Sequence, residues 1–455
     1  MRILLVQPDY RGQFGGLIQV MMPEPFALEM IAAAVPEHEV RIVDLRVQDD
    51  LGATLASFRP QLVGVTSLTA NSPQALQVCQ EAKRLDPDIF TVVGGFHAAL
   101  NPQDFDSAGV DAVAVGEGEV TFAELVAALD RGSDLRRVPG LRLRYQGRVV
   151  ETPQRGLIKN LDALPLPARH LTAAYREHYA WYLWPEVYAV ETARGCPYRC
   201  NFCAVWQFHH GRCRLKSPAR VLDELLAVPG KHVFIVDDNF LQDLTRAQRI
   251  GQLIAEAGLS KRYFVQARSD SIVRRPAVVE QWAKLGLSIV GLGFETFRQE
   301  ELQSFNKRNT VAANEKAVRI LQSNGVQIWG CFIVDPAWER RDFDGLLEHL
   351  ERLRLSFHQF TVLTPIPGTG FFTEKVQELL TTNYERFDFL HSVLPTKLPV
   401  AEFYENLARL YAFSKLNLAD LRRGWREGDI TPATLRRLAS MLQRLANPQA
   451  YLAGS

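Results

Sequence analysis

Neither sign of charge predominates in this chain of 455 residues, which carries 52 Lys and Arg against 51 Asp and Glu. A protein that binds nucleic acid needs a basic patch or stripe, so this balance disfavours a polynucleotide partner. Long apolar runs are also lacking: the start, MRILLVQPDYRG, has only four consecutive aliphatics, too few for a signal peptide. No run approaches the length that spans a bilayer. We therefore expect a cytoplasmic protein without a transmembrane segment.

Cysteine is scarce, with six in the whole chain, yet three of them, Cys196, Cys200 and Cys203, lie together in RGCPYRCNFC. In a cytoplasmic protein such thiols remain reduced and free to bind metal. A [4Fe–4S] cube normally takes four Cys ligands, so a cube on these three would keep one iron open. The alternative is a tetrahedral zinc site closed by Cys213 or a neighbouring histidine. A pair of Cys-x-x-Cys knuckles, the usual zinc pattern, does not occur.

Short aliphatic strands alternate with helical segments over the first 145 residues: ILLVQ, EVRIVDL, LVGVTS, IFTVVGG and DAVAVG. Continuous apolar strands are buried on both faces, as in a parallel sheet covered by helices. We predict a doubly wound α/β domain over residues 1–145, of flavodoxin-like strand order. Ligands bind such sheets beyond the carboxyl ends of the strands. The candidate binding residues at those ends are Gln7, Ser67, Thr69, Gly94, Gly95, His97, Gly116, Glu117 and Gly118.

The next segment, 146–184, predicts a hairpin and a linker between domains. LRLRYQGRVVE is typical of a hairpin that turns at Gln146 and Gly147. The proline-rich LDALPLPARH that follows indicates a connection. G-x-G-x-x-G, the dinucleotide fingerprint, is absent, which argues against a nicotinamide enzyme.

Six strand candidates alternate with helical patterns over residues 185–398, which predicts parallel strands joined by right-handed crossovers. Sites in such domains lie at the carboxyl ends of the strands. Asp237, Asp238, Arg268 and Glu295 follow strands there. The last segment, 399–455, predicts amphipathic helices that either pack on the core or shape a substrate cavity.

The spacing Cys-x-x-x-Cys-x-x-Cys, with Phe202 before the last cysteine, resembles the cluster loop of the radical S-adenosylmethionine superfamily. The resemblance implies a [4Fe–4S] cluster whose open iron binds the amino and carboxylate groups of S-adenosylmethionine. Six strand–helix units suit the partial (β/α)6 barrel of that superfamily. The resemblance also gives the strand-end residues roles: Asp237 or Asp238 at the amino group, Arg268 at the carboxylate, Glu295 at the ribose and Phe202 near the adenine.

VGGFHAALNP and VGEGE, ahead of that loop, resemble the cobalamin-binding domain of the cobalamin-dependent (class B) members of the superfamily. Within that family, the chain most resembles the hopanoid C-3 methylases and the bacteriochlorophyllide methylases. The segments that carry this resemblance are CAVWQFHHGRCRLKSP, FIVDDNFL, FNKRNT, CFIVDPAWERRDF and TVLTPIPGT. Asn306 and Lys307, in FNKRNT, are further candidate site residues. Asp-x-His-x-x-Gly, the loop that places a histidine on cobalt, is absent, so no such histidine is available as the lower ligand.

This resemblance implies a cobalamin-dependent methyltransferase that acts on an unactivated carbon of an apolar, hopanoid-like or tetrapyrrole-like substrate. Its cofactors would be a [4Fe–4S] cluster, S-adenosylmethionine and cobalamin, with a reductant such as flavodoxin or ferredoxin, and a lipid-like substrate would be reached by peripheral contact with a membrane. Three alternatives stay open: an oxidative cyclase of tetrapyrrole metabolism, a tRNA methylthiotransferase-like enzyme and a non-enzymatic cobalamin sensor. The methylthiotransferase would need further cluster cysteines and a basic RNA-binding domain. The sensor would need neither the cysteine triplet nor Glu295.

Overall fold

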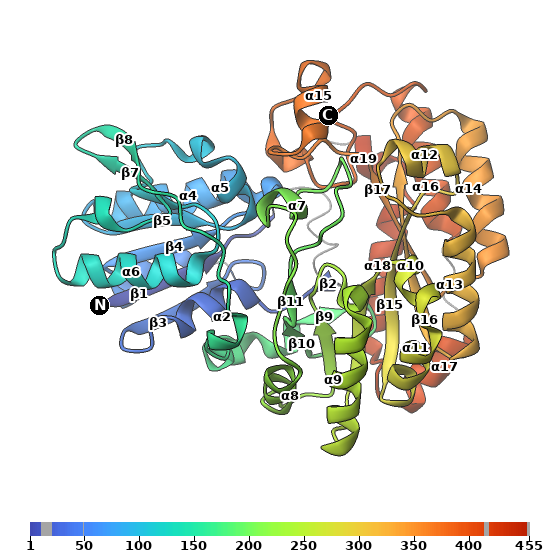
Figure 1. The fold of residues 1–455 in the computed structure, drawn as a ribbon. Coiled ribbons are helices and arrows are strands. Elements are labelled where there is room, and N and C mark those ends of the chain that lie inside the picture. The colour runs from blue at the N-terminus through green and yellow to red at the C-terminus, as the bar shows by residue number, and fades with distance from the viewer. Residues whose placement is uncertain (11–20, 49, 414–417, 453–455) are drawn as a thin grey trace.

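Two separate sheets organise the chain, one of seven strands in the N-terminal part and one of six strands in the second half (Figure 1). The computed structural model describes residues 1–10, 21–48, 50–413 and 418–452. The two α/β domains lie side by side, and the cysteine-bearing segment around α7 (Val205–Phe208) runs between them (Figure 1).

Five parallel strands form the main part of the N-terminal sheet, in the spatial order β3-β1-β4-β5-β6. This is the 2-1-3-4-5 order of flavodoxin-like folds, as predicted. Their bounds are β1 (Arg2–Gln7), β3 (Glu39–Asp44), β4 (Leu62–Thr66), β5 (Phe90–Gly94) and β6 (Ala112–Ala114). Helices cover both faces, α2 (Phe26–Ala33) and α6 (Gly118–Asp130) on one and α3 (Leu51–Phe58) and α4 (Ser72–Leu85) on the other. Each face therefore has its own apolar core.

The predicted hairpin is present and belongs to this sheet. Strand β7 (Leu141–Tyr145) pairs antiparallel with β6 and with β8 (Arg148–Glu151). Gln146 and Gly147, at the turn, both have positive φ, as a two-residue hairpin loop of the primed type requires. The boundary that we expect at residue 145 thus cuts the hairpin, whereas the sheet continues to the end of β8.

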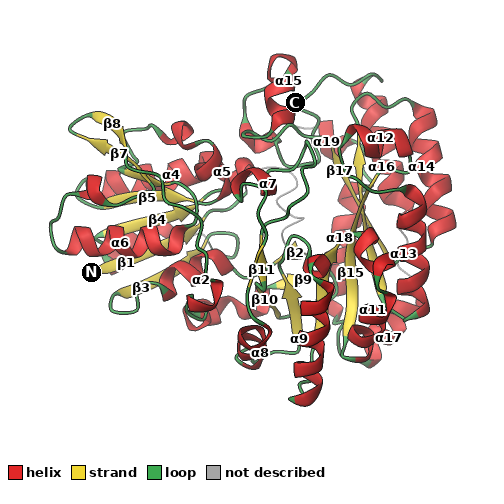
Figure 2. Ribbon diagram, in the orientation of Figure 1, coloured by secondary structure: helices red, strands yellow, loops and turns green. Residues whose placement is uncertain are grey.

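The second domain is an open, all-parallel sheet whose six strands follow one another in sequence order. They are β10 (Val187–Val190), β13 (His232–Ile235), β14 (Arg262–Ala267), β15 (Leu287–Glu295), β16 (Gln327–Val334) and β17 (Phe357–Val362). The crossover helices include α8 (Pro218–Leu226), α9 (Leu244–Glu256), α11 (Pro276–Lys284), α13 (Val311–Ser323) and α14 (Arg340–Leu353). Their spacing on the outside of the curved sheet is visible in Figure 2. The predicted six-unit partial barrel is confirmed.

Most of the described C-terminal segment is helical; 414–417 and 453–455 lie outside the described residues. They are α16 (Val400–Phe413), α17 (Leu418–Arg426), α18 (Pro432–Leu445) and α19 (Gln449–Leu452). α16 packs on α14 and β17, and α18 packs on α16. Among the described residues, no helix combines the length and apolar character needed to cross a membrane.

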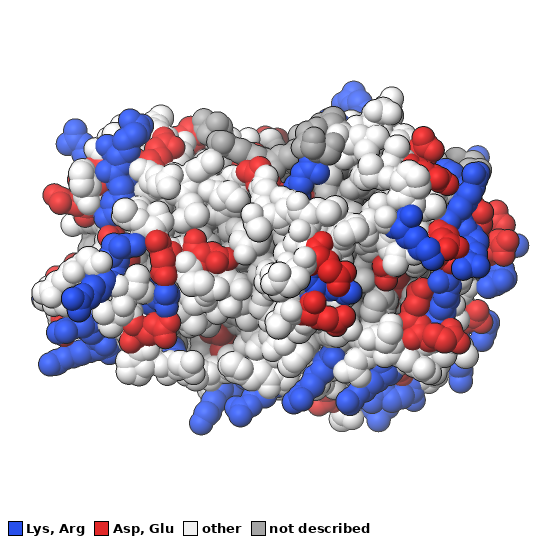
Figure 3. All heavy atoms as spheres, turned by 90° about the horizontal axis from the view of Figure 1, so that it is seen from above, with Lys and Arg blue, Asp and Glu red and all other residues white. Residues whose placement is uncertain are grey.

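Charged side chains of both signs are interspersed on the face shown in Figure 3, and neither sign forms a continuous patch there. This distribution agrees with the balanced composition of the chain.

Candidate active site

The cysteine loop lies between β11 (Ala193–Arg194) and α7, beyond the carboxyl end of the first barrel strand. The segment 304–308 supports it: the Asn201 N–H donates to the Phe305 carbonyl (3.2 Å), and the Asn306 amide donates to the Arg199 carbonyl (2.7 Å). Asn306 has φ 52°, a left-handed conformation that asparagine adopts more readily than most residues. The structure thus places Asn306 as a support of the loop.

All three thiols of the loop are free. Burial raises the pKa of the Cys203 thiol to about 12 and that of Cys213 to about 11, so metal binding at either must displace a proton. Within the described ranges, no three His, Cys, Asp or Glu side chains converge closely enough for one metal ion, as tetrahedral zinc requires. A cube spreads its ligands over several irons, so three free thiols that do not converge on one point are compatible with a cluster.

The two candidate aspartates differ in what they contact. Asp237 is buried, and its Oδ1 accepts the N–H groups of Thr192 (2.6 Å) and Ala193 (2.9 Å). Asp238 accepts the Gly195 N–H at 3.1 Å. Burial, with the charge of Asp237, raises the pKa of Asp238 to about 6. Asp237 therefore holds a strand end, whereas Asp238 faces a cavity beside the cysteines.

Arg268 follows β14, and its guanidinium lies beside the cysteine loop. Its Cζ is 3.5 Å from the centroid of the Tyr198 ring. Tyr198 lies between Cys196 and Cys200 in the sequence. Nε donates to Asp270 (3.0 Å) and Nη2 to the Lys307 carbonyl (2.8 Å). Arg268 is thus a buried, fixed cation next to the cluster position, where a carboxylate would bind by charge-assisted hydrogen bonds.

Glu295 ends β15 and forms a buried ion pair with Lys307. Burial lowers the pKa of Lys307, but the charges of Glu295 and Cys200 outweigh it and raise that pKa overall. Phe202 packs edge-on against Phe305, with 5.5 Å between ring centroids. The structure therefore places Glu295, Lys307 and Phe202 close to the cysteines.

A cavity of about 280 Å³, the sheet-edge cavity, lies at the carboxyl ends of β4, β5 and β6. Five of the predicted strand-end residues line it: Gly94, Gly95, Gly116, Glu117 and Gly118. Gly95 has φ +100°, and a Cβ there would lie 2.6 Å from the Ser67 carbonyl oxygen. Gly95 is thus required by the close approach of its own backbone to Ser67, whereas a Cβ at Gly116 would meet no protein atom within 4 Å, so the cavity stays open at that position.

The other predicted residues of this sheet edge are placed differently. Thr69 and His97 line a second cavity, but the His97 ring is buried against Tyr384 and its Nε2 lies 3.2 Å from Asp104 Oδ2. Gln7 and Ser67 line neither cavity. Gln7 donates to the carbonyl of the next residue, and the Ser67 backbone bonds to β5.

The second, large cavity has a volume of about 640 Å³ and lies between the two domains and inside the barrel. Phe96 lines both cavities, so they adjoin. Three charged residues, Glu295, Glu385 and Asp388, line the large cavity, and no Lys or Arg does within the described residues. The remaining walls are mainly apolar and come from distant segments, for example Leu68, Leu100, Tyr182, Phe202, Cys203, Ile333, Phe360, Leu363, Met441 and Leu445.

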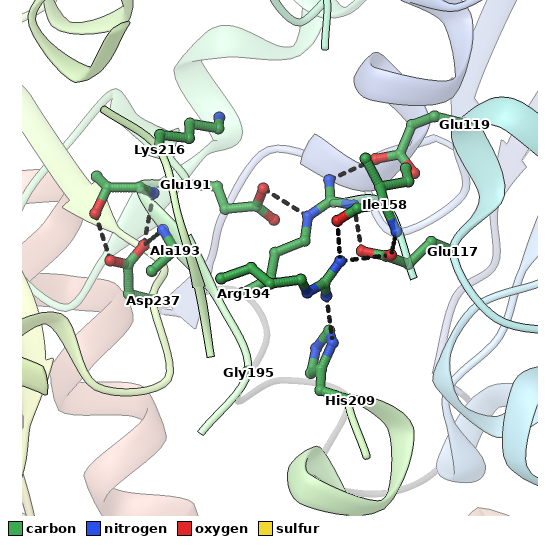
Figure 4. A network of polar contacts seen from close by, with 12 residues as sticks. Glu117, Glu119, Ile158, Glu191, Ala193, Arg194, Gly195, His209, Lys216 and Asp237 are labelled. Carbon is green, nitrogen blue, oxygen red and sulfur yellow. Dashed lines mark hydrogen bonds and ion pairs between the residues drawn. The ribbon is translucent and has the colours of Figure 1, made fainter. Parts of the chain in front are cut away.

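Sequence reasoning did not identify a buried ion-pair network next to the cysteine loop (Figure 4). Arg194 lies 2.8 Å from Glu117, 2.5 Å from Glu119 and 2.7 Å from Glu191. Arg214 lies 2.7 Å from Glu117. The only signals in the sequence are the arginine before the first cysteine and the second glutamate of VGEGE.

Comparison with known proteins agrees with this geometry. A model of the B12 binding domain matches residues 22–126, and one of the radical SAM superfamily matches 190–350. A hopanoid C-3 methylase of Methylococcus capsulatus is 33% identical over 85% of this chain and 75% of its own. An anaerobic magnesium-protoporphyrin IX monomethyl ester cyclase of Rubrivivax gelatinosus is 26% identical (94% and 79%). A bacteriochlorophyllide d C-8(2)-methyltransferase of Chlorobaculum tepidum is 24% identical (79% and 78%).

Solved structures share the fold of the whole chain. The methyltransferase TsrM of Kitasatospora setae, solved with cobalamin and a [4Fe–4S] cluster, superposes with a TM-score of 0.69, at 19% identity, over 92% of this chain and 91% of its own. OxsB, solved with aqua-cobalamin and S-adenosylmethionine, superposes with a TM-score of 0.70, at 15% identity, over 99% of this chain and 74% of its own. With three cysteines open to a cluster and a glycine-lined cavity beside them, the chain belongs to the cobalamin-dependent radical S-adenosylmethionine enzymes, whose cofactors are a [4Fe–4S] cluster, S-adenosylmethionine and cobalamin.

Proposed function

We propose that this enzyme transfers a methyl group to an unactivated carbon of an uncharged, largely apolar polycyclic substrate. The observation that carries the proposal is the wall of the large cavity, which is mainly apolar and to which the described residues contribute three acidic side chains but no Lys or Arg. A bound carboxylate or phosphate would lack a cationic partner there, and a buried unpaired charge is costly. A hopanoid-like hydrocarbon fits this wall better than a carboxylated tetrapyrrole.

The cofactors would be held as follows. Cys196, Cys200 and Cys203 would bind the cluster, and the glycine-lined sheet-edge cavity would hold part of cobalamin. Arg268 and Asp238 would face the carboxylate and amino groups of S-adenosylmethionine. When bound, the cluster and S-adenosylmethionine supply the radical that abstracts hydrogen from carbon, and cobalamin supplies the methyl group.

Glu295 would accept hydrogen bonds from the ribose hydroxyls of S-adenosylmethionine. Its carboxylate pairs with Lys307 and lines the large cavity, so it presents an acceptor at the position where the cavity meets the cysteine loop. Phe202 and Ile333 line the same region and are apolar, which excludes water from the reacting atoms.

Access to the large cavity favours a lipid-like substrate. Leu68 and Phe389 both line it, and each leaves 46% of its surface exposed. An apolar rim of this kind suits peripheral contact with a membrane by an otherwise cytoplasmic enzyme. A small reductant such as flavodoxin or ferredoxin would deliver the electron to the cluster.

Anaerobic protein reconstituted with iron, sulfide and cobalamin tests the proposal. On reduction it should cleave S-adenosylmethionine to 5′-deoxyadenosine, and replacing Cys196, Cys200 and Cys203 by Ala should abolish that cleavage. Cys213→Ser is the matched control and should retain the cluster, because we assign this thiol no ligand role. Cleavage that survives the triple substitution would refute the cluster assignment.

An oxidative ring closure is the second candidate, because the cyclase of Rubrivivax gelatinosus is a relative over 94% of this chain. Methionine labelled in its methyl group separates the two in cells that make the protein. Methylation predicts label in an extracted apolar lipid, absent from a strain that lacks the gene. A product with one new oxygen atom and no label would favour the cyclase.

A further inference from the structure

Two arginines that face each other across a small ribbon bind the same carboxylate of the other domain. Arg194 on β11 pairs with Arg214 on β12 (Arg214–Leu215) in antiparallel register. Arg194 Nη1 lies 2.8 Å from one oxygen of Glu117, and Arg214 Nη1 lies 2.7 Å from the other. Like charges opposite each other on paired strands repel. The ribbon, whose two strands flank the cysteine loop in sequence, therefore depends on a glutamate of the N-terminal sheet.

Arg194 uses all three nitrogens of its guanidinium in this network (Figure 4). Its side chain is 9% exposed, and those of Glu117 and Glu119 are 4% and 8% exposed. Burial lowers the pKa of Arg194, but the charges of Glu191 and Glu119 outweigh it, so that pKa is raised and the group stays charged. Buried ion pairs seldom add net stability, because desolvation offsets their attraction. The planar guanidinium of Arg194, paired with three carboxylates, instead fixes their positions relative to one another.

The residue after Arg194 fixes the approach to the first cysteine. Gly195 has φ +86°, its N–H donates to Asp238, and a Cβ there would collide with the Arg212 carbonyl oxygen. On the other side of Arg194, Ala193 donates its N–H to Asp237. Three consecutive residues ahead of Cys196 are thus held, and Arg194 is the one held by the N-terminal domain.

The same carboxylates face the sheet-edge cavity. Glu117, Glu119, Glu191 and Arg194 all line it, together with the glycines that follow β5 and β6. A ligand that fills this cavity must contact or displace the groups that bind the guanidinium. Glu117 and Glu119, which such a ligand would contact, are hydrogen-bonded directly to Arg194, the residue that leads into the cysteine loop.

We propose that Arg194 is a positioning residue that couples the two cofactor sites. Cobalamin in the sheet-edge cavity would order Glu117 and Glu119, which hold Arg194 and hence the cysteine loop in the conformation that binds the cluster. This inference rests on the proposed assignment of the cofactors to these two sites, not on the methylation. Coupling of this kind is reciprocal, and typical values change affinity by about 5-fold to 150-fold.

Hydroxocobalamin is the probe, and its dissociation constant is measured by absorption titration of full-length anaerobic protein before and after cluster reconstitution. In the wild type we expect cobalamin to bind at least about fivefold tighter when the cluster is present. Arg194→Lys keeps the charge but cannot hold three carboxylates, so each cofactor should still bind while the ratio of the two constants falls to about one.

Arg155→Gln is the matched control: its guanidinium pairs with Glu124 and lines neither cavity, so the ratio should stay at the wild-type value. Glu119→Gln removes one contact of Arg194, should lower the ratio, and decides the question if a melting curve shows Arg194→Lys to be unfolded. A ratio of about one in the wild type, or a wild-type ratio in the folded Arg194 or Glu119 variant, overturns the proposal. No substrate is present, so a failure of the methylation proposal would not affect this measurement.

Discussion

Glu295 occupies a left-handed backbone position, with φ 63°, at the irregular end of β15. A non-glycine residue there costs about 1–3 kcal/mol. The strain is accompanied by a specific contact, because a Cβ at Gly293 would collide with both the Glu295 carboxylate and the Lys307 ammonium. The glycine and the strained residue together place one buried ion pair beside the cysteine loop.

This geometry predicts that Glu295→Gln weakens the binding of S-adenosylmethionine to reconstituted protein by about tenfold or more. Loss of a hydrogen bond to a charged acceptor costs about 1.5–3 kcal/mol, and each 1.4 kcal/mol is a factor of ten. Equilibrium dialysis measures the dissociation constant. Glu385→Gln, which changes another carboxylate of the large cavity, serves as the control and should bind S-adenosylmethionine normally. Equal constants in both variants would remove Glu295 from the site.

At the scale of elements, the C-terminal helices close the large cavity and are tied to the opposite end of the barrel. Asp429, between α17 and α18, accepts from Lys231 (2.7 Å) and His232 (2.9 Å) and lies 3.2 Å from Arg262. His232 and Arg262 are the first residues of β13 and β14. One carboxylate thus connects the turn between two helices to the amino ends of two strands.

This connection predicts a loss of stability in acid. Burial raises the pKa of Asp429, but hydrogen bonds from His232 and Lys231 and the charge of Arg262 outweigh it and lower that pKa to about 2. Because the folded pKa lies below the ordinary value of 3.8, the contribution is present above about pH 4 and is lost as the pH falls toward 2.

Asp429→Asn should therefore lower the melting temperature at pH 7 by about 4 °C or more and flatten its fall between pH 4 and pH 2. Circular dichroism of the cofactor-free protein measures both. Asp134→Asn is the matched control, since hydrogen bonds from Arg136 also lower the pKa of that carboxylate to about 2, but its side chain is 32% exposed, against 3% for Asp429. An exposed pair contributes little, and an equal effect of the two substitutions would contradict the structural role of Asp429.

At the scale of the whole molecule, the large cavity exists only because three parts of the chain meet. Leu68 comes from the N-terminal sheet edge, Phe202 from the cysteine loop and Met441 from α18. Tyr384 and Glu385 bridge back to the N-terminal domain, where they contact His97 and Gln74. The cavity therefore depends on the relative placement of the domains as much as on its lining.

The charges of this wall predict a preference that needs no knowledge of the substrate. The neutral dye Nile red should bind in the large cavity and fluoresce. Anionic anilinonaphthalene sulfonate should bind more weakly, because the charged side chains that the described part of the chain contributes to the wall are all acidic. Met441→Trp should fill part of the cavity and reduce Nile red binding severalfold, while cobalamin binding at the sheet-edge cavity stays unchanged. Stronger binding of the anionic dye would argue against an uncharged substrate.

Local patterns in the sequence determined the elements and the cysteine loop. The apolar strands, their alternation with helices and the Cys-x-x-x-Cys-x-x-Cys spacing depend on neighbouring residues, so the flavodoxin-like order and the six-unit barrel followed from them. The glycines at the strand ends followed as well, because the carboxyl ends of parallel strands share one edge.

Only the tertiary structure decided which of those residues act together. It turned Asp237 to backbone N–H groups and Asp238 to the cavity, joined the hairpin to the N-terminal sheet, and brought Arg194 to Glu117, 77 positions away in sequence. Ion pairs and cavities arise where distant segments meet. Their partners are set by the packing of whole domains, which leaves no periodic signal in the chain.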